Sequence, residues 1–481
     1  MKRRLIVPRT PLLQWFAIVV VPFATLLPML ASITVIGAAV LALFVVVVVI
    51  DAGFGRRHLQ GISVELPDLI RLTTGRRAQI ELRLRNESMQ RRQLLIGLGL
   101  PPEIESERPD LLVALPGTVV LSQLSWPCTP RQRGTFLLDA VHVEITSPLG
   151  LWAARASLPA HCELRIYPNL ERERKDLTAL FLNRGPFGLH VQRQVGRGRE
   201  FEKLREYIAG DSYDEIHWKA TAKRGHPVTK IFQIERTQEL YVVIDASRLS
   251  ARRIDPSAPV AIGTGSVTGD PRSIGVGRSM VSETPLARDK AGAPTTLERF
   301  ITAALTLGLA AEQQGDLFGL VTFSDRVHRF VRARNGKEHY GLCRDAIYAL
   351  EPRLVAPDFD ELNAFLRLRM RRRALLVFLT SLDDPVVVES FTRGIELLAR
   401  RHLVLVSVAP PPGARPLFVA PDVSSVDQIY ERLGGHLLWH DLRQLGQKLQ
   451  HRGVHFVMLE DERMSAQLVS QYLGIKQRQL L

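Results

Sequence analysis

The chain has 481 residues and a formal net charge of +14, with 63 lysines and arginines against 49 aspartates and glutamates. This length is too great for one hydrophobic core and predicts two or three domains. Net charge bears on solubility and nonspecific binding rather than on fold, and the partner that this charge favours first is anionic lipid. The three cysteines have no metal-binding spacing, which predicts free thiols; a Cys128–Cys162 disulfide is the alternative for an oxidising compartment.

A long apolar segment follows the N-terminus, because residues 12–50 contain no charged side chain. One helix needs about 20 residues to cross a bilayer, so the segment predicts two transmembrane helices, about 12–30 and 32–50, in a membrane hairpin over residues 1–57. Basic residues flank the segment on both sides: Lys2, Arg3, Arg4, Arg9, Arg56 and Arg57. The positive-inside rule then places both ends, and the soluble domains, in the cytoplasm. A cleaved signal peptide is disfavoured because the apolar segment is too long for one.

Residues 58–168 alternate apolar and polar side chains with the period of two that β-strands have. Ile80, Leu82 and Leu84 point to one face of a predicted strand, and a second run at residues 141–146 alternates in the same way. Turn residues such as Asn86 separate these runs. The pattern predicts an all-β sandwich domain of the immunoglobulin or fibronectin type, which serves as a spacer or a contact surface.

Residues 240–481 change to an alternation of strands and helices. Short apolar runs predict strands, and their residues are Leu240–Ile244, Leu317–Phe323, Ala374–Thr380, Leu403–Val408 and Val454–Leu459. Helix starts are predicted at Thr295, where Glu298 completes a capping box, and at Asp384, which Pro385 follows. The alternation predicts a doubly wound α/β domain with a parallel sheet. Residues 251–294 interrupt it with a segment rich in Gly, Pro, Ser and Thr, which predicts a flexible insert.

Three stretches carry a resemblance to a known family: Gly198–Ser247, Ser147–Trp152 and Arg165–Leu170. Together they resemble the bacterial family called domain of unknown function 58. The resemblance implies an inner-membrane protein in which a β-rich domain precedes a von Willebrand factor A-like domain. It also implies a MoxR-type AAA+ ATPase as the partner.

Asp245 is the candidate for a metal site. The resemblance implies an Asp-x-Ser-x-Ser motif, which surrounds a magnesium ion in metal-binding members of this fold. Asp245 and Ser247 match, but Leu249 stands at the third position and Ser381 stands where a later carboxylate is expected. A hydrocarbon cannot bind a hard cation. We therefore interpret Asp245 and Ser247 as a degenerate metal-adhesion motif that is not occupied, with Asp245 orienting the loop after its strand. No cofactor is expected.

The connecting segment, residues 169–239, contains most of the family signature. The resemblance extends to eight residues of this segment, which are charged, aromatic, aliphatic or glycine: Glu202, Arg205, Tyr207, Gly210, Asp211, Ile216, Trp218 and Lys219. Charged side chains around Tyr207 and Trp218 can fasten two domains together or present anchor residues to a partner protein. Both interpretations stay open at this point.

The resulting functional hypothesis is a membrane-anchored interaction platform that binds a MoxR-type ATPase and membrane lipid. No nucleic-acid partner and no small-molecule substrate are expected, and the chain lacks the nucleophile-elbow, phosphate-loop and His-Glu-x-x-His motifs of common enzymes. A metal-dependent adhesion module exposed outside the cell is the first alternative. An unrecognised hydrolase or nuclease is the second.

Overall fold

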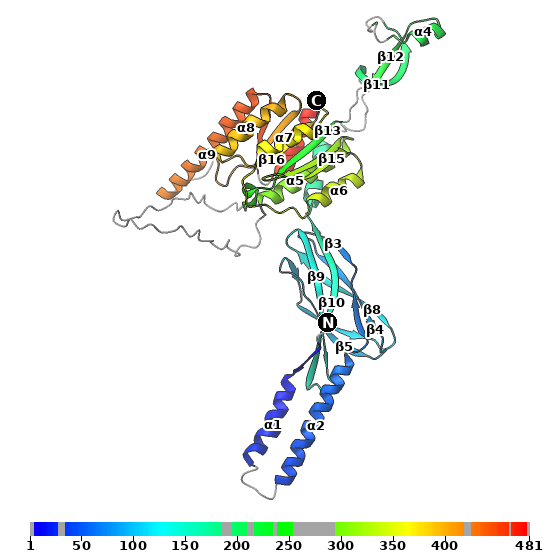
Figure 1. The fold of residues 1–481 in the computed structure, drawn as a ribbon, viewed down its shortest axis with the longest axis vertical. Helices are drawn as coiled ribbons and strands as arrows, with labels where there is room; N and C mark the ends of the chain where they lie inside the picture. Colours follow the sequence, from blue (N-terminus) through cyan, green and yellow to red (C-terminus); the bar gives the residue numbers. More distant parts are fainter. Residues whose placement is uncertain are drawn as a thin grey trace, which may run out of the picture. The chain divides into compact units, whose positions relative to one another are not determined.

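A computed structural model (Figure 1) describes residues 4–26, 34–183, 195–208, 213, 216–233, 238–253, 294–417, 425–460 and 463–478. The chain divides into two compact units, Met1–Asn169 and Leu170–Leu481. The first unit contains two helices and a β domain with its own core. The second contains a mixed sheet with a separate hydrophobic cluster on each face.

Two apolar helices begin the first unit, α1 (Thr10–Leu26) and α2 (Thr34–His58). Residues Ala38–Gly55 of α2 are long and apolar enough to cross a membrane, and α1 contributes a shorter apolar stretch, Thr10–Val21. The helix α2 extends past its expected end at Ile50, so Arg56 and Arg57 lie within it rather than after it. Composition predicted the stop because Asp51 is the first charged residue after the apolar segment.

The reason for the extension is a set of hydrogen bonds between α2 and the turn Ser147–Trp152. The Asp51 carboxylate is buried and accepts from the Ser147 hydroxyl at 2.6 Å and from the Leu149 backbone N–H at 3.0 Å. The Trp152 indole N–H donates to the Val48 carbonyl at 3.0 Å. A buried carboxylate needs such donors, and here they come from the β domain. These three hydrogen bonds, which join Asp51 and Val48 of α2 to Ser147, Leu149 and Trp152, form what we call the helix clamp.

Two sheets form the β domain. One has the order β1 (Arg4–Pro8), β10 (Trp152–Tyr167), β9 (Gly134–Thr146), β5 (Arg92–Leu98) and β7 (Asp110–Leu115), with β3 (Leu69–Thr73) beside β10. The other has the order β2 (Ile62–Glu65), β4 (Ala78–Asn86), β8 (Leu121–Pro130) and β6 (Ile104–Ser106). All pairs are antiparallel except β3 with β10. The two sheets share one core.

The alternation read from the sequence is confirmed in β4, where Ile80, Leu82 and Leu84 are all fully buried. Cys128 and Cys162 are buried free thiols. One prediction is corrected: residues at the N-terminus were assigned wholly to the membrane hairpin, yet Arg4–Pro8 is strand β1, paired antiparallel with β10. Five residues next to an apolar helix carry too short a pattern to reveal a strand whose partner lies about 150 residues away.

The sheet of the second unit has the order β15 (Val327–Arg334), β14 (Leu317–Phe323), β13 (Glu239–Asp245), β16 (Leu375–Thr380), β17 (Leu403–Val408) and β18 (His455–Met458). Neighbouring strands from β14 to β18 are parallel, which confirms the predicted apolar runs as strands of a parallel sheet. The edge strand β15 is antiparallel and was not predicted. It is half exposed and rich in arginine, so it lacks the apolar run of a central strand.

Helices cover both faces of this sheet, as the doubly wound prediction requires. The helices on one face are α3 (Glu171–Asn183), α5 (Thr296–Gln313), α6 (Lys337–Ile347) and α10 (Met464–Gln477). Those on the other are α7 (Phe359–Arg369), α8 (Pro385–Ala399) and α9 (Val426–His451). The capping box of Thr295 with Glu298 and the Asp384 cap before Pro385 are both present.

A buried charge group holds the C-terminal helix α10 to the sheet. Asp316 is almost fully buried and accepts hydrogen bonds from the Tyr472 hydroxyl and, at 2.8 Å, from the Lys476 ammonium. Its other oxygen accepts from the Gln238 backbone N–H at 3.2 Å. The helix α3, from the connecting segment, also belongs to this unit because Leu177 lies in the same core cluster as α5 and α10.

The family signature forms a two-stranded hairpin of β11 (Val195–Glu206) and β12 (Val228–Gln233), with the short helix α4 (Trp218–Arg224) between them. After β13 the chain makes a 3-10 turn, η3 (Arg248–Ala251). Most of the predicted flexible insert, residues 254–293, lies outside the described residues. Its two ends meet: Arg253 bridges Thr295, and the Thr296 N–H donates to the Arg252 carbonyl at 2.8 Å.

The helix clamp yields a first prediction. Replacing Asp51 by Ala leaves the buried Ser147 hydroxyl and the partly buried Leu149 N–H without their acceptor, which costs about 1–3 kcal/mol. Hydrogen exchange of the β9 and β10 amides in the full-length chain measures the free energy of opening, and we expect it to fall by this amount. Asp139→Ala, which removes an exposed carboxylate of β9, is the control. Equal exchange in the two variants would contradict the role of the clamp.

Candidate functional site

The carboxyl end of β13 carries Asp245, whose side chain is completely buried. Its carboxylate accepts a hydrogen bond from the Thr380 hydroxyl at 2.6 Å and one from the Ser247 backbone N–H at 2.9 Å. Thr380 ends the neighbouring parallel strand β16. The carboxyl ends of adjacent parallel strands meet at one edge of the sheet, which is where doubly wound folds bind ligands.

The pKa of Asp245 is raised above its ordinary value of 3.8 because burial removes the carboxylate from water. The hydrogen bonds from Thr380 and Ser247 act in the opposite direction, since they stabilise the ionised form. The nearby charge of Asp383 adds to the increase. Burial is the largest of these effects, so the protonated form of Asp245 is favoured relative to an exposed aspartate.

The residues after Asp245 build a turn rather than a ligand shell. Leu249, at the third motif position, is buried in the hydrophobic cluster on the α7, α8 and α9 face. The Ser247 hydroxyl caps the 3-10 turn, and the Ser250 hydroxyl donates to the Ser247 carbonyl at 2.8 Å. Both serine hydroxyls therefore serve the local backbone.

Two aspartates after β16 pair with two arginines after β13, and the sequence analysis did not predict these pairs. Asp384 accepts from Arg248 at 3.2 Å, and Asp383 forms an ion pair with Arg252. A sequence pattern could have indicated these ion pairs. Two aspartates follow the apolar run of β16, and two arginines follow that of the neighbouring strand β13. The Asp358 carboxylate, in the loop before α7, caps that helix by accepting from the Glu361 N–H.

These donors do not fit the magnesium shell that the fold family implies. Leu249 supplies no oxygen, Asp383 faces a guanidinium, and both Asp245 oxygens already accept hydrogen bonds. Among the described residues, no group of three or more His, Cys, Asp or Glu side chains is placed to hold a metal ion. The Asp245 carboxylate accepts from the Ser247 N–H, which is the contact expected of an aspartate that orients the loop after its strand. The absence of a bound metal stays a prediction.

The structure describes part of the predicted signature set. Tyr207 stacks on Tyr213 with ring centroids 6.1 Å apart, and Trp218, the first residue of α4, is 69% exposed. Arg205 and Glu202 lie in β11, and Lys219 is exposed on α4. Gly210 and Asp211 lie outside the described residues. The choice between fastening domains and presenting anchor residues therefore stays open, with Trp218 accessible for the second role.

A second exposed surface was missed at the sequence level. Five apolar side chains of α9 share one helix face and are each 44–65% exposed: Val426, Ile429, Tyr430, Leu433 and Leu437. Their spacing of three and four residues was the available signal. The later turns of the same helix pack into the core through Leu442, Leu445 and Leu449. We call the five residues the α9 stripe.

The transition between the two parts of α9 lies at Gly435. A Cβ atom there would collide with the carbonyl oxygen of Gly413, so only glycine permits the loop after β17 to cross the helix at this point. Gly413 itself has a φ of 81°, in the left-handed region. The loop supports the helix at Gly435, and four of the five stripe residues precede that point.

A serine in the turn after β14 lies beside a histidine at the start of β15. The Ser324 hydroxyl is 2.7 Å from His328 Nε2 and donates to Asp325 at 2.6 Å. This spacing resembles a nucleophile beside its base. Ser324 has no exposed surface, however, so the pair is not accessible to a substrate in this structure.

Comparisons with known proteins agree with the predicted family. The family model described as "Protein of unknown function DUF58" matches residues 203–253 and 287–415, less than half of the chain. The resemblance stated from the sequence is therefore confirmed as a match to this family model, over part of the signature hairpin and much of the α/β sheet. Ser147–Trp152 and Arg165–Leu170 lie outside the matched residues. No curated protein sequence matches the chain.

Solved structures with low similarity also match. The conserved hypothetical protein BatB from Bacteroides thetaiotaomicron is 11% identical, with a TM-score of 0.30, over 50% of this chain and 99% of that one. The SpRpn10 VWA domain is 12% identical, with a TM-score of 0.26, over 49% and 95% of the two chains. An aerotolerance-related membrane protein from Bacteroides fragilis is 11% identical, with a TM-score of 0.26, over 49% and 98%.

The buried state of Asp245 predicts a specific pH dependence. Because the folded pKa lies above the ordinary value of 3.8, the unfolded chain releases its proton first as the pH rises. As the pH rises from the unfolded to the folded pKa, the free energy of unfolding therefore falls by about 1.4 kcal/mol for each pH unit. Above the folded pKa this decrease is complete. Asp245→Asn, which has no ionisable group, removes this slope.

The measurement is hydrogen exchange of the β13 and β16 amides over a pH series, corrected for the intrinsic exchange rate. The stability of the wild type relative to Asp245→Asn should fall as the pH rises above 3.8. An exposed carboxylate, Asp345, provides the control substitution Asp345→Asn. A constant difference between wild type and Asp245→Asn at all pH values would show that the pKa is not raised.

Proposed function

We propose that this protein is a membrane-anchored interaction platform that binds a MoxR-type AAA+ ATPase through its von Willebrand factor A-like domain. Its action is binding rather than catalysis. The family resemblance supports the choice of partner, and the candidate span Ala38–Gly55 supports the anchor. We further propose that α1 is a second membrane span, that the β domain is an immunoglobulin- or fibronectin-like spacer, and that both domains face the cytoplasm of a bacterial inner membrane.

The observation that carries the proposal is the α9 stripe. Monomeric proteins rarely expose a row of large apolar side chains, and such rows mark surfaces that a partner covers. An amphipathic helix laid into an apolar groove is a recurrent mode of recognition, read out by residues three, four and seven positions apart. Tyr430, at 65% exposure, is the residue type that most often dominates binding energy at such surfaces.

The signature hairpin supplies a second candidate surface with Trp218 as its anchor. Trp218 and Tyr213 are both strongly exposed, and Ile208 is exposed near them in sequence. We propose this hairpin as an additional contact with the same partner. The two surfaces make different predictions, because each can be removed without altering the other.

The rival functions require features that the described residues do not favour. A metal-dependent adhesion module needs an occupied cation site, whereas Leu249 and the Arg252–Asp383 pair stand where ligands are needed. It also needs the domain outside the cell, against the positive-inside argument. A hydrolase needs an accessible nucleophile, and Ser324 is buried. We propose that no metal, cofactor, nucleic acid or small-molecule substrate takes part.

Affinity capture tests the platform directly. Tagged full-length chain is recovered from native membranes in the presence of ATP, and co-purified proteins are identified. We expect an AAA+ ATPase with the wild type and a loss of more than about 30-fold in recovery with Tyr430→Ala combined with Leu433→Ala, since removal of anchor residues costs about 2 kcal/mol or more.

The control is Val386→Ala, which truncates a still more exposed apolar residue on α8. Loss with Trp218→Ala but not with the α9 variant would move the contact to the hairpin. No ATPase with the wild type, together with protease access to the domains from outside the cell, would favour the adhesion module instead.

Calorimetry with magnesium tests the second part of the proposal. Full-length chain in detergent, titrated with magnesium chloride to millimolar concentration, should give no saturable heat, because the Asp245 carboxylate is satisfied by protein donors. A saturable heat that disappears in Asp245→Ala would overturn the degenerate-motif interpretation. A heat that persists in this variant would point to nonspecific binding elsewhere.

A further inference from the structure

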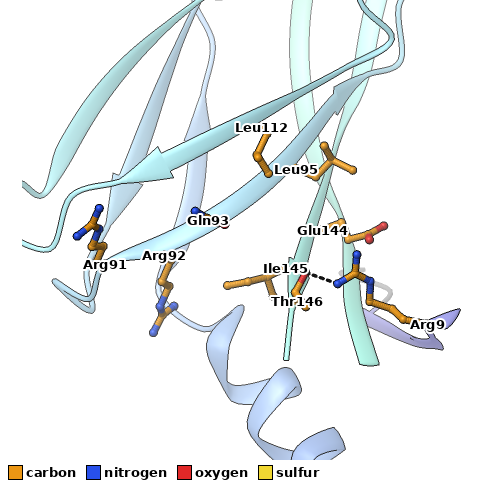
Figure 2. Close-up of a pocket in the computed structure, with 9 residues that line it drawn as sticks. All are labelled: Arg9, Arg91, Arg92, Gln93, Leu95, Leu112, Glu144, Ile145 and Thr146. Carbon is orange, nitrogen blue, oxygen red and sulfur yellow. Dashed lines mark hydrogen bonds between the residues drawn. The ribbon is translucent and has the colours of Figure 1, made fainter. Parts of the chain in front are cut away.

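A cavity of about 420 Å³ lies on the outer side of the β domain, at the end that carries the two N-terminal helices. Three arginine side chains line it (Figure 2): Arg9 on one side, and Arg91 and Arg92 on the other. The Arg9 guanidinium donates to the hydroxyl of Thr146, the last residue of β9, at 3.3 Å. The cavity is thus bordered by cations on two sides.

The charge of this lining is positive. Its single carboxylate, Glu144, is already paired with Arg155 at 2.7 Å. Two guanidinium nitrogens of Arg92 are held, one by the Gln60 carbonyl at 3.2 Å and one by the Gln90 side chain at 2.9 Å. Arg92 therefore contributes charge from a fixed position, while Arg9 and Arg91 are the more exposed groups. Guanidinium groups bind phosphate through paired, charge-assisted hydrogen bonds.

Both apolar helices touch the border of the cavity. Arg9 immediately precedes α1, and its backbone N–H donates to the Leu151 carbonyl at 3.0 Å. Arg92 is bound to Gln60, two residues after α2 ends at His58. Arg9 and Arg92 are therefore held by hydrogen bonds next to the ends of the two helices.

The helix clamp fixes the position of the cavity along the axis of the apolar helix α2. Trp152 donates its indole N–H to Val48, inside the candidate span Ala38–Gly55. In the same turn Leu149 is 60% exposed. Tryptophan is enriched where the apolar layer of a membrane meets its headgroups. If α2 spans a membrane, the clamp thus brings this end of the β domain, and the arginines with it, to the headgroup layer.

We propose that this cavity binds the phosphate group of an anionic phospholipid, with Arg9 and Arg91 as the binding residues and Arg92 as a positioning residue. The proposal rests on the membrane anchor of the proposed function. Basic pockets beside membrane helices on the cytoplasmic side bind such headgroups. The bound lipid would hold the β domain against the membrane surface, in addition to the covalent link through the helices.

Native mass spectrometry of the full-length chain in detergent tests the site. The chain is titrated with phosphatidylglycerol, with phosphatidylcholine and with inorganic phosphate. We expect one retained phosphatidylglycerol, and about fivefold weaker retention for each of Arg9→Gln and Arg91→Gln. Arg83→Gln, which neutralises an exposed arginine on β4 in the other sheet, should retain the lipid like the wild type.

Each other result has a definite meaning. Equal retention of phosphatidylcholine, or equal loss in Arg83→Gln, would overturn the site. Saturable binding of inorganic phosphate with no preference for phosphatidylglycerol would overturn the lipid assignment. Thermal unfolding of each variant must match the wild type, so that loss of lipid is not loss of fold.

Fractionation of cells separates the failure of this site from the failure of the proposed function. A chain found outside the membrane fraction refutes the anchor, whereas a membrane chain without lipid preference refutes only this site.

Discussion

The first unit depends on how one buried carboxylate is satisfied. Asp51 lies in α2 directly after an apolar segment, and an uncompensated charge there would be costly to bury. The Ser147 hydroxyl and the Leu149 N–H bind it at 2.6 and 3.0 Å, so the helix continues into the β domain instead of ending at the apolar boundary. Strand β1 ties the chain before α1 to the same sheet. Both helices are thus held by the β domain. The proposed platform and the proposed lipid site both depend on this attachment.

The same solution recurs in the second unit. Asp245 accepts from a hydroxyl at 2.6 Å and from a backbone N–H at 2.9 Å, the donor types that bind Asp51. At the edge of the sheet the neighbouring carboxylates, Asp383 and Asp384, are matched by arginines. The loops after β13 and β16 are therefore joined by two ion pairs. These ion pairs join the loops at the edge of the sheet where doubly wound folds bind ligands.

Much of the fold was readable from local patterns, because apolar runs and caps depend on neighbouring residues. The alternation in β4, the apolar strands β13, β14, β16 and β17, and the Thr295 capping box all follow from spacing within about ten residues. The misses are nonlocal. Strand β1 needs β10 as its partner, and the Arg252–Asp383 pair joins residues 131 positions apart in the sequence. The exposure of Tyr430 follows from where α9 leaves the core, which its amphipathic pattern alone does not reveal.

The two ends of the segment between Arg253 and Thr295 lie side by side. These residues form a bridge, and Thr296 donates to the Arg252 carbonyl, so the chain leaves and re-enters the α/β domain at one point. The entropy of closing a loop rises only slowly with its length. Length and sequence between the two residues can therefore vary without moving β13 or α5. A reporter domain whose own termini lie close together can be spliced in at this point, which makes it a natural place to label the protein while leaving both ends of the chain untouched.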